Sequence, residues 1–595
     1  MISTCQHNFY IPVMGTSFTI DTPLLIAKHG ISSVISLVDD VLIEQVRKYW
    51  STQYNEPFEP ITNAVPDHRA KRITAYLNLL NKLVNDQITK LKNCQTETEE
   101  FKFYFELLPT NNNSHKIYQQ LLNTNNPTQR AELLAELRNS ITPGSIDVNI
   151  MTKLDVASYD QQGGLLPYQF SDAASALRGY ATSDLSSTMV FSAGFNPHLY
   201  NYLAEFSDFF PNQHHALKKK LCLKVSDYRS ATIQGKYLAK RGIWVSEYRV
   251  ESAINCGGHA FLNDGHLLGP ILEEFKDKKK VLVEELHSIY AAALNKLKGI
   301  TLKEPLAIKI TTQGGVGTHE EHDFLLNYYK LDAIGWGSPF LLVPEATNVD
   351  HKTLEQLLAA TEQGVYLSKS SPIGVPFWNL KNSTSEQARL KRISDGTPGS
   401  PCIKGFTRLN TEFTDKPICQ ASRQYQSLKL KELESRTDLD LEQKSRISEE
   451  IMLKSCICND LGGSVLLKRE ITINTPPAIC PGPNIVNFKK ILTLKELVDH
   501  IYGKRQLLIN PNRPHVFIRE LQLQVSILAK ELKDASANLP ARSKKKLAEV
   551  KNNLQSGIEY YRKIIGSSIE EKEKLFLKHL ADLARELNQL VITSS

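Results

Sequence analysis

Two glycine-rich loops near the middle of the chain have the composition of a phosphate-binding site. Gly314 and Gly315 directly follow a β-rich run, and Gly335, Gly337 and Ser338 lie at the end of the next one. Because glycine has no Cβ, it lets backbone N–H groups approach a phosphate closely. We therefore expect an anion site between these two loops.

A second group of residues that could carry chemistry is a set of cysteines. Five of the nine cysteines lie in one segment that is also rich in proline and glycine. Several thiolates converging from loops are what an iron–sulfur cluster or a zinc ion requires. Their spacing matches no standard motif, so buried unpaired thiols are the alternative. The five residues are Cys402, Cys419, Cys456, Cys458 and Cys480.

The elements that must position these residues repeat a pattern of strand and then helix. Eight short β-rich runs, most of them followed by a helical pattern or an insertion, are typical of a parallel sheet with crossover helices. They predict an α/β fold, the closed (β/α)8 TIM barrel, in which an anion site between the loops after strands seven and eight is common. The runs cover residues 9–14, 31–37, 148–155, 188–193, 221–226, 242–247, 306–312 and 332–336.

The chain is longer than one barrel needs, so we expect additional regions. We assign residues 1–350 to the barrel, with a helical insertion at about 41–146. Residues 351–490 form an irregular cysteine-containing segment, and residues 491–595 a mainly helical C-terminal region. Active sites of this fold lie at the C-terminal ends of the strands, so an insertion after strand two could cover the substrate mouth; a stabilising lobe is the equal alternative.

Composition argues against two classes of partner. The 71 basic and 64 acidic residues leave a formal charge of only +7, which is typical of a mixed solvated surface and argues against nucleic-acid binding. No window approaches the apolar length of a membrane span, and no basic stretch precedes an apolar run with a cleavage site. We expect a cytoplasmic protein with no membrane partner, in which thiols stay reduced.

Residues 308–347 resemble the FMN-phosphate region of the nitronate monooxygenase family, formerly called 2-nitropropane dioxygenases, which also includes flavin enoyl reductases. The resemblance rests on the two glycine loops and on Phe340, Glu345 and Ala346, which follow them. It extends over about residues 9–347, interrupted by the insertion. It implies a barrel that binds FMN and performs redox chemistry at carbon.

The same resemblance implies roles for residues in two other loops. In the family a Gly-Gly-His sequence places an imidazole over the flavin, and here it matches Gly257, Gly258 and His259. His259 would act as a general base or as a donor that orients the substrate, because the imidazole pKa lies near neutrality. The strand end at Met14 and Gly15 would run beneath the flavin ring, with ordinary core packing as the alternative for Met14.

Two further positions bear on flavin tuning and on substrate choice. Lys153, near the end of strand three, could stabilise the negative charge of the reduced flavin, or it could simply be solvated. Asn255 and Cys256 stand where the family usually has Glu-Ala before Gly-Gly-His. This departure concerns the substrate more than the cofactor.

Together these features predict an FMN-dependent oxidoreductase similar to nitronate monooxygenases, which oxidises or reduces a small carbon substrate with His259 as acid or base. One alternative is an enoyl reductase-like enzyme that uses NAD(P)H on a thioester-linked acyl chain. Another is a non-catalytic scaffold that binds flavin or metal. The expected partners are a small-molecule or acyl substrate, NAD(P)H or an electron-transfer protein, and further copies of the chain in a homo-oligomer.

Overall fold

Eight parallel strands close into a barrel, and their order around it follows the order of the chain. The computed structural model describes residues 6–94, 97–160, 162–260, 262–534, 541–564 and 571–591. Each predicted β-rich run overlaps one strand, so the predicted (β/α)8 fold is confirmed. The strands are β1 (Phe9–Ile11), β2 (Ser32–Ser36), β3 (Ile146–Ile150), β4 (Thr188–Phe191), β5 (Lys220–Val225), β6 (Val245–Glu251), β7 (Lys309–Gln313) and β8 (Ala333–Gly335).

The strands are short and almost entirely buried. β2 and β3 are buried at every position, as expected for strands with the barrel interior on one face and helices on the other. In the parallel register Glu251, at the end of β6, lies opposite Gln313, at the end of β7. The C-terminal ends of the strands therefore meet at one end of the barrel, which we call the mouth.

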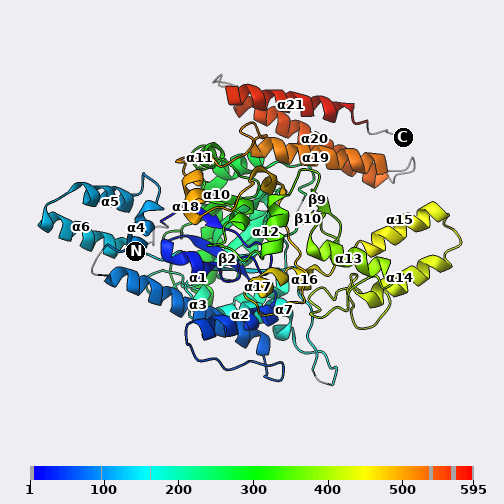
Figure 1. Cartoon of the computed structure of the whole chain (residues 1–595), viewed down its shortest axis with the longest axis horizontal. Helices are drawn as coiled ribbons and strands as arrows, with labels where there is room; N and C mark the ends of the chain where they lie inside the picture. Colours follow the sequence, from blue (N-terminus) through cyan, green and yellow to red (C-terminus); the bar gives the residue numbers. More distant parts are fainter. Residues whose placement is uncertain are drawn as a thin grey trace.

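Helices follow most of the strands and cover the outside of the barrel (Figure 1). The longest of these helices ends at Gly299, whose φ of 68° is the left-handed conformation typical of a helix C-cap. After β8 a short 3-10 helix, η4 (Ser338–Leu342), follows the strand instead of an α-helix. The helices are α1 (Thr22–Ile26), α7 (Asp172–Ala181), α8 (Pro197–Leu203), α9 (Tyr228–Ala239), α10 (Leu268–Lys298) and α11 (His319–Tyr328).

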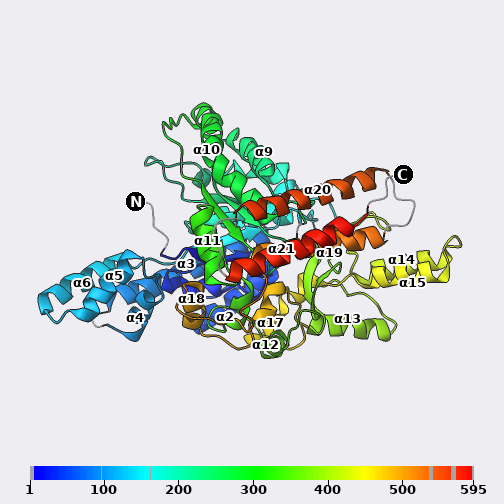
Figure 2. The same cartoon turned by 90° about the horizontal axis from the view of Figure 1, so that it is seen from above.

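The helical insertion between β2 and β3 has two parts. Its first two helices pack beside the barrel helices, and there Asp40 accepts hydrogen bonds from both Arg69 and Arg72. The other three form a small hydrophobic core largely their own and project from the body (Figures 1 and 2). In chain order the helices are α2 (Asp40–Gln53), α3 (His68–Asn93), α4 (Glu99–Glu106), α5 (Asn113–Asn123) and α6 (Pro127–Ser140).

The projecting part of the insertion contacts the end of the barrel opposite the mouth. Tyr104 donates a hydrogen bond to the Thr142 carbonyl at 2.9 Å, shortly before β3 begins. Gln6, shortly before β1, donates to the Ser140 carbonyl at 3.0 Å. Because these contacts lie at the N-terminal ends of strands, they favour the stabilising lobe for α4–α6 over a cover for the mouth.

Residues 351–490 contain several regular elements besides the charged helical stretch that the sequence predicts at about residues 428–453. Ser383, Ser422 and Asp440 each accept an N–H group from the first turn of the helix that follows, so side-chain caps start several short helices. Helices this short show little periodicity in the sequence. The elements are α12 (His351–Leu358), β9 (Val365–Ser368), β10 (Phe377–Leu380), α13 (Thr384–Ser394), α14 (Arg423–Ser435), α15 (Leu441–Met452), α16 (Ile457–Asp460), α17 (Gly463–Lys468) and η5 (Pro483–Asn487).

The C-terminal region is helical, as predicted. α18 (Leu494–Ile501) begins with a capping box between Thr493 and Glu496. The last three helices lie side by side next to α10 (Figures 1 and 2). Of the helices in the described ranges, none combines the length and the apolar character needed to cross a membrane. The last three are α19 (Val516–Asp534), α20 (Ala541–Ile564) and α21 (Glu571–Gln589).

Candidate active site at the mouth of the barrel

Loops after β1, β6 and β8 meet at the mouth and bring several predicted cofactor residues together. The Gly15 N–H donates to the Gly257 carbonyl at 2.7 Å. Gly257 has a φ of 83°, and a Cβ there would overlap the Met14 backbone, so this position requires glycine. A Cβ on Gly337 would lie 2.9 Å from the Cys256 Cβ. These loops are therefore packed backbone to backbone.

The two predicted glycine loops line one small cavity. Its volume is about 10 Å³, which is room for about one water molecule. Among the described residues, none accepts a hydrogen bond from the backbone N–H of Gly314, Gly315, Val316, Gly337 or Ser338. The cavity is thus bordered by unused donors. Its lining residues are Pro12, Asn255, Cys256, Gln313, Gly314, Gly315, Val316, Gly335, Gly337 and Ser338.

A carboxylate of the chain itself takes the next N–H group of the loop after β7. Glu321 is 3% exposed, and its oxygens accept the Gly317 N–H at 2.8 Å and the Val516 N–H at 2.7 Å. The Arg513 guanidinium forms a buried ion pair with the same carboxylate. The two buried charges compensate each other, and they tie the C-terminal region to the start of α11.

A polar cluster that the sequence analysis missed surrounds the end of β6. Glu251 accepts hydrogen bonds from Lys224 at 3.1 Å, from Gln313 at 2.6 Å and from Asn255 at 3.0 Å. The Asn255 side-chain oxygen is buried and has no partner among the described residues, so it is an unused acceptor on the cavity wall. The signal in the sequence was a polar residue at the end of β6 and of β7, where Glu251 and Gln313 stand.

His259 lies at the mouth beside residues from other parts of the chain. Its Nε2 is 2.7 Å from the Ser371 Oγ, and its backbone pairs with Phe377. Burial, followed by the nearby charge of Lys153, lowers the pKa of His259 to about 4, so the imidazole is neutral at pH 7. Lys153 and His259 are therefore neighbours, although neither lines the small cavity. Nothing in the sequence pointed to Ser371.

Residues 480–484, which we call the cover segment, pack against the loops that line the cavity. The Cys480 carbonyl accepts the Gly257 N–H at 3.0 Å. The Asn484 side chain donates to the Val316 carbonyl at 3.0 Å. The cover segment therefore contacts both the loop after β6 and the loop after β7. Sequence patterns could not reveal this contact, because residues 480–484 are far along the chain from both loops.

The five cysteines predicted as metal ligands do not form one group. Cys480 lies at the mouth, after α17. Its thiol donates to the Gly258 carbonyl, in the loop after β6, at 3.3 Å. Elsewhere the thiols of Cys402 and Cys419 lie close enough to shift each other's pKa, as do those of Cys456 and Cys458, and Cys458 also lies near the first pair. Within the described ranges no group of three or more His, Cys, Asp or Glu side chains is arranged to hold a metal ion. The structure does not support the predicted iron–sulfur or zinc site.

The mouth fits the phosphate of FMN in its donors, and the cavity between the glycine loops is too small for the flavin ring. The unused N–H groups of the glycine loops suit an anionic oxygen. The unpartnered Asn255 oxygen offers an acceptor to a polar ligand. A cavity of about 10 Å³ does not hold an isoalloxazine, since pockets for molecules of this size are about 300–1,000 Å³.

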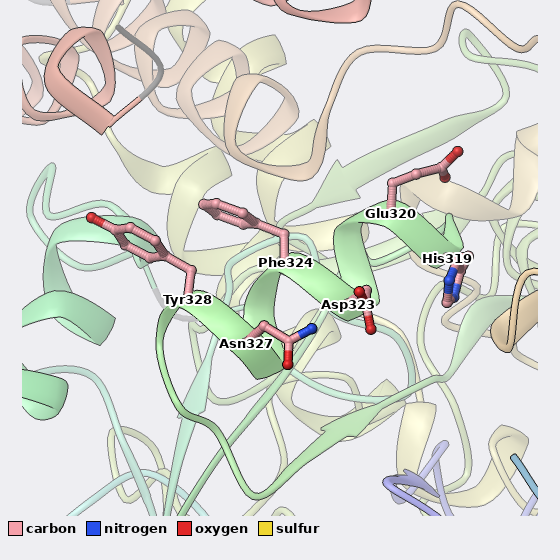
Figure 3. Close-up of a pocket in the computed structure, with 6 residues that line it drawn as sticks. All are labelled: His319, Glu320, Asp323, Phe324, Asn327 and Tyr328. Atoms are coloured by element: carbon pink, nitrogen blue, oxygen red, sulfur yellow. The ribbon is translucent and has the colours of Figure 1, made fainter. Parts of the chain in front are cut away.

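A larger hollow of about 580 Å³ lies along α11 (Figure 3). All the residues that line it belong to this one helix, and Figure 3 shows Phe324 and Tyr328 standing on the same side of it. None of the predicted site residues lines this hollow. The candidate site therefore stays at the mouth of the barrel.

Fold and mouth together define a (β/α)8 barrel with a small glycine-lined cavity. No protein-family model matches the chain, and no curated protein matches it. Among solved structures it is similar to the enoyl reductase domain of MlnA from the macrolactin biosynthesis cluster of Bacillus amyloliquefaciens. The identity is 16% and the TM-score 0.33, with 64% of this chain and 85% of that one covered.

Two other solved structures show the same level of similarity. FabK from Thermotoga maritima is 13% identical with a TM-score of 0.31, and 64% of this chain and 81% of that one are covered. A nitroalkane oxidase from Streptomyces ansochromogenes is 10% identical with a TM-score of 0.28, and the coverage is 63% and 84%. These values are too low to assign a function to the chain.

Proposed function

We propose that the chain is an FMN-dependent oxidoreductase whose cofactor phosphate binds between the loops after β7 and β8. The observation that carries the proposal is the set of unused N–H groups at Gly314, Gly315, Val316, Gly337 and Ser338 around one cavity at the mouth. The resemblance of residues 308–347 to the FMN-phosphate region of nitronate monooxygenases supports the same position.

FMN, when bound, supplies a ring that accepts or donates an electron pair. The residues of the chain bind and orient. Neutral His259 accepts a proton from a carbon acid or holds the substrate, and Lys153 places a positive charge beside it. We favour oxidation of a small carbon substrate, as in nitronate monooxygenases. NAD(P)H-dependent reduction of a thioester-linked chain would use the same two side chains.

A non-catalytic scaffold is the second candidate, and the closed cavity favours it. The cover segment takes the Gly257 N–H and the Val316 carbonyl, so the chain itself satisfies part of the mouth without a ligand. A scaffold that holds no flavin would purify colourless. The oxidoreductase would take up FMN and give a yellow protein.

The test compares FMN with riboflavin, which lacks the phosphate. Fluorescence titration of the full chain should show FMN binding about 10- to 150-fold more tightly than riboflavin, because hydrogen bonds to a charged group contribute about 1.5–3 kcal/mol. Ser338→Asp should remove this preference by placing a negative charge at the cavity, while Ser394→Asp on the exposed end of α13 should leave it unchanged. No binding of FMN by the wild-type chain would refute the proposal in favour of the scaffold.

A further inference from the structure

Four thiols lie at the base of the hairpin that α14 and α15 form. Cys419 comes shortly before α14, and Cys456 and Cys458 come directly after α15. The hairpin projects from the body on the side opposite α4–α6 (Figures 1 and 2). A pair of neighbouring thiols therefore lies at each end of the hairpin. Cys402 and Cys419 precede α14, and Cys456 and Cys458 follow α15.

Backbone hydrogen bonds hold the segments of Cys402 and Cys419 side by side. Ser400 forms a bridge with Ser422, in which its N–H donates to the Ala421 carbonyl at 2.9 Å and its carbonyl accepts the Arg423 N–H at 2.8 Å. Beside this bridge the Thr407 hydroxyl lies 3.1 Å from the Cys419 sulfur, and the adjacent Arg408 donates to the Cys402 carbonyl at 3.2 Å, so one short segment holds both cysteines. The geometry is thus set by the chain itself.

The two thiols differ in their surroundings. Cys402 is half-buried, and the Arg408 guanidinium, which donates to the Cys402 carbonyl at 3.2 Å, places a positive charge near the thiol that favours a thiolate. Cys419 is 2% exposed, and its sulfur lies 3.1 Å from the Thr407 hydroxyl and accepts the Ala421 N–H at 3.4 Å. Cys402 is therefore the accessible member of the pair and Cys419 the enclosed one.

We propose that Cys402 and Cys419 are a redox-active dithiol that a low-molecular-weight disulfide, such as oxidised glutathione, converts to an intramolecular disulfide. The Cys402 thiolate attacks one sulfur of the glutathione disulfide, whose S–S bond breaks and releases one glutathione thiolate. Cys419, losing its proton to solvent, then attacks the Cys402 sulfur and releases the second glutathione. Two protein thiols are oxidised, and one glutathione disulfide is reduced to two thiols.

The dithiol sits on a loop that is anchored to the mouth of the barrel. Lys404 forms a buried ion pair with Asp39, directly after β2. Phe406 lines a small cavity with Val38 and with residues at the end of β3. A disulfide at Cys402 would therefore fix a loop that borders the mouth. The redox state of the pair would then influence the site, although the two cysteines are not part of it.

The test counts thiols in the full-length protein across a series of glutathione redox ratios. After alkylation with N-ethylmaleimide and peptide mass spectrometry, we expect a Cys402–Cys419 disulfide that forms under oxidising ratios and is reversed by excess reduced glutathione. Cys402→Ser and Cys419→Ser should each abolish this disulfide. Cys94→Ser, at a half-buried thiol in the helical insertion, should leave it unchanged.

Three results with the wild-type protein would overturn the proposal. Cys402 and Cys419 could stay fully alkylated at the most oxidising ratio. The purified protein could contain zinc or iron in stoichiometric amount that protects these thiols from alkylation. Oxidation could instead join Cys402 or Cys419 to Cys456 or Cys458. None of these readouts depends on FMN binding, so they are independent of the proposed function.

Discussion

Replacing Gly257 by alanine tests how the mouth is assembled, and the adjacent Gly258 provides the matched control. At Gly257 the φ of 83° is unfavourable for alanine by about 1–2 kcal/mol, and the new Cβ would overlap the Met14 backbone. Overpacking of this kind costs about 1–3 kcal/mol more. At Gly258 the φ is not left-handed and nothing lies within 4 Å of a new Cβ, so alanine should change stability by less than about 0.5 kcal/mol.

The assay is amide hydrogen exchange at Gly15, whose N–H donates to the Gly257 carbonyl at 2.7 Å. A local destabilisation of about 2–5 kcal/mol corresponds to about 30- to 4,000-fold faster exchange, since about 1.4 kcal/mol is a factor of ten. Gly258→Ala should stay within about threefold of the wild-type rate. Equal exchange rates in the two variants would refute the close contact between the loops after β1 and β6.

Three further predictions concern the charges and the cover of the mouth. Arg513→Met should lower the free energy of unfolding in urea by about 3–5 kcal/mol because it leaves the Glu321 carboxylate buried and unpaired. As a control, Arg562→Met at an exposed ion pair should lower it by less than about 1 kcal/mol. Equal losses in the two variants would contradict the prediction. Asn484→Ala removes a hydrogen bond of the cover segment and should speed FMN uptake by the apoprotein about 2- to 12-fold in stopped-flow fluorescence. Asn474→Ala, at an exposed position, is the control. An unchanged rate in Asn484→Ala would contradict the prediction. Burial lowers the pKa of His322 from 6.5 to about 3. The free energy of unfolding therefore keeps its full value above pH 6.5 and falls by about 1.4 kcal/mol per pH unit as the pH drops towards 3. Urea titrations of His322→Gln should show a shallower pH dependence than the wild type, and an identical one would contradict this.

The barrel could be predicted because its signals are local. Each strand is a short run of residues favourable for β-structure, and the glycine loops directly follow two of them. The boundaries of β6 were less accurate: the prediction ended at residue 247, and the strand continues to Glu251. The reason is a buried ion pair inside the barrel between Glu247 and Arg249, with the Arg249 guanidinium over the Tyr10 ring. Two charged side chains made a core strand look exposed.

Most contacts that complete the mouth could not be predicted, because they join residues far apart in the chain. Ser371 reaches His259 across 112 positions, and Arg513 reaches Glu321 across 192. Such pairs are fixed by how the barrel and the C-terminal region pack, and a single sequence carries no periodic signal for them. The cysteines show the same effect, since nearness in the sequence grouped Cys480 with four residues that it does not join.

The regions beyond residue 350 finish the barrel instead of forming a separate unit. A (β/α)8 barrel leaves unpaired backbone groups in the loops at its mouth, and a ligand commonly takes them. Here Cys480, Asn484 and Glu321, the last held by Arg513, take several of these groups, while the N–H groups around one small cavity stay unused. A ligand that binds in that cavity would therefore find N–H groups that the described chain leaves unused, between loops that the cover segment and Glu321 hold in place.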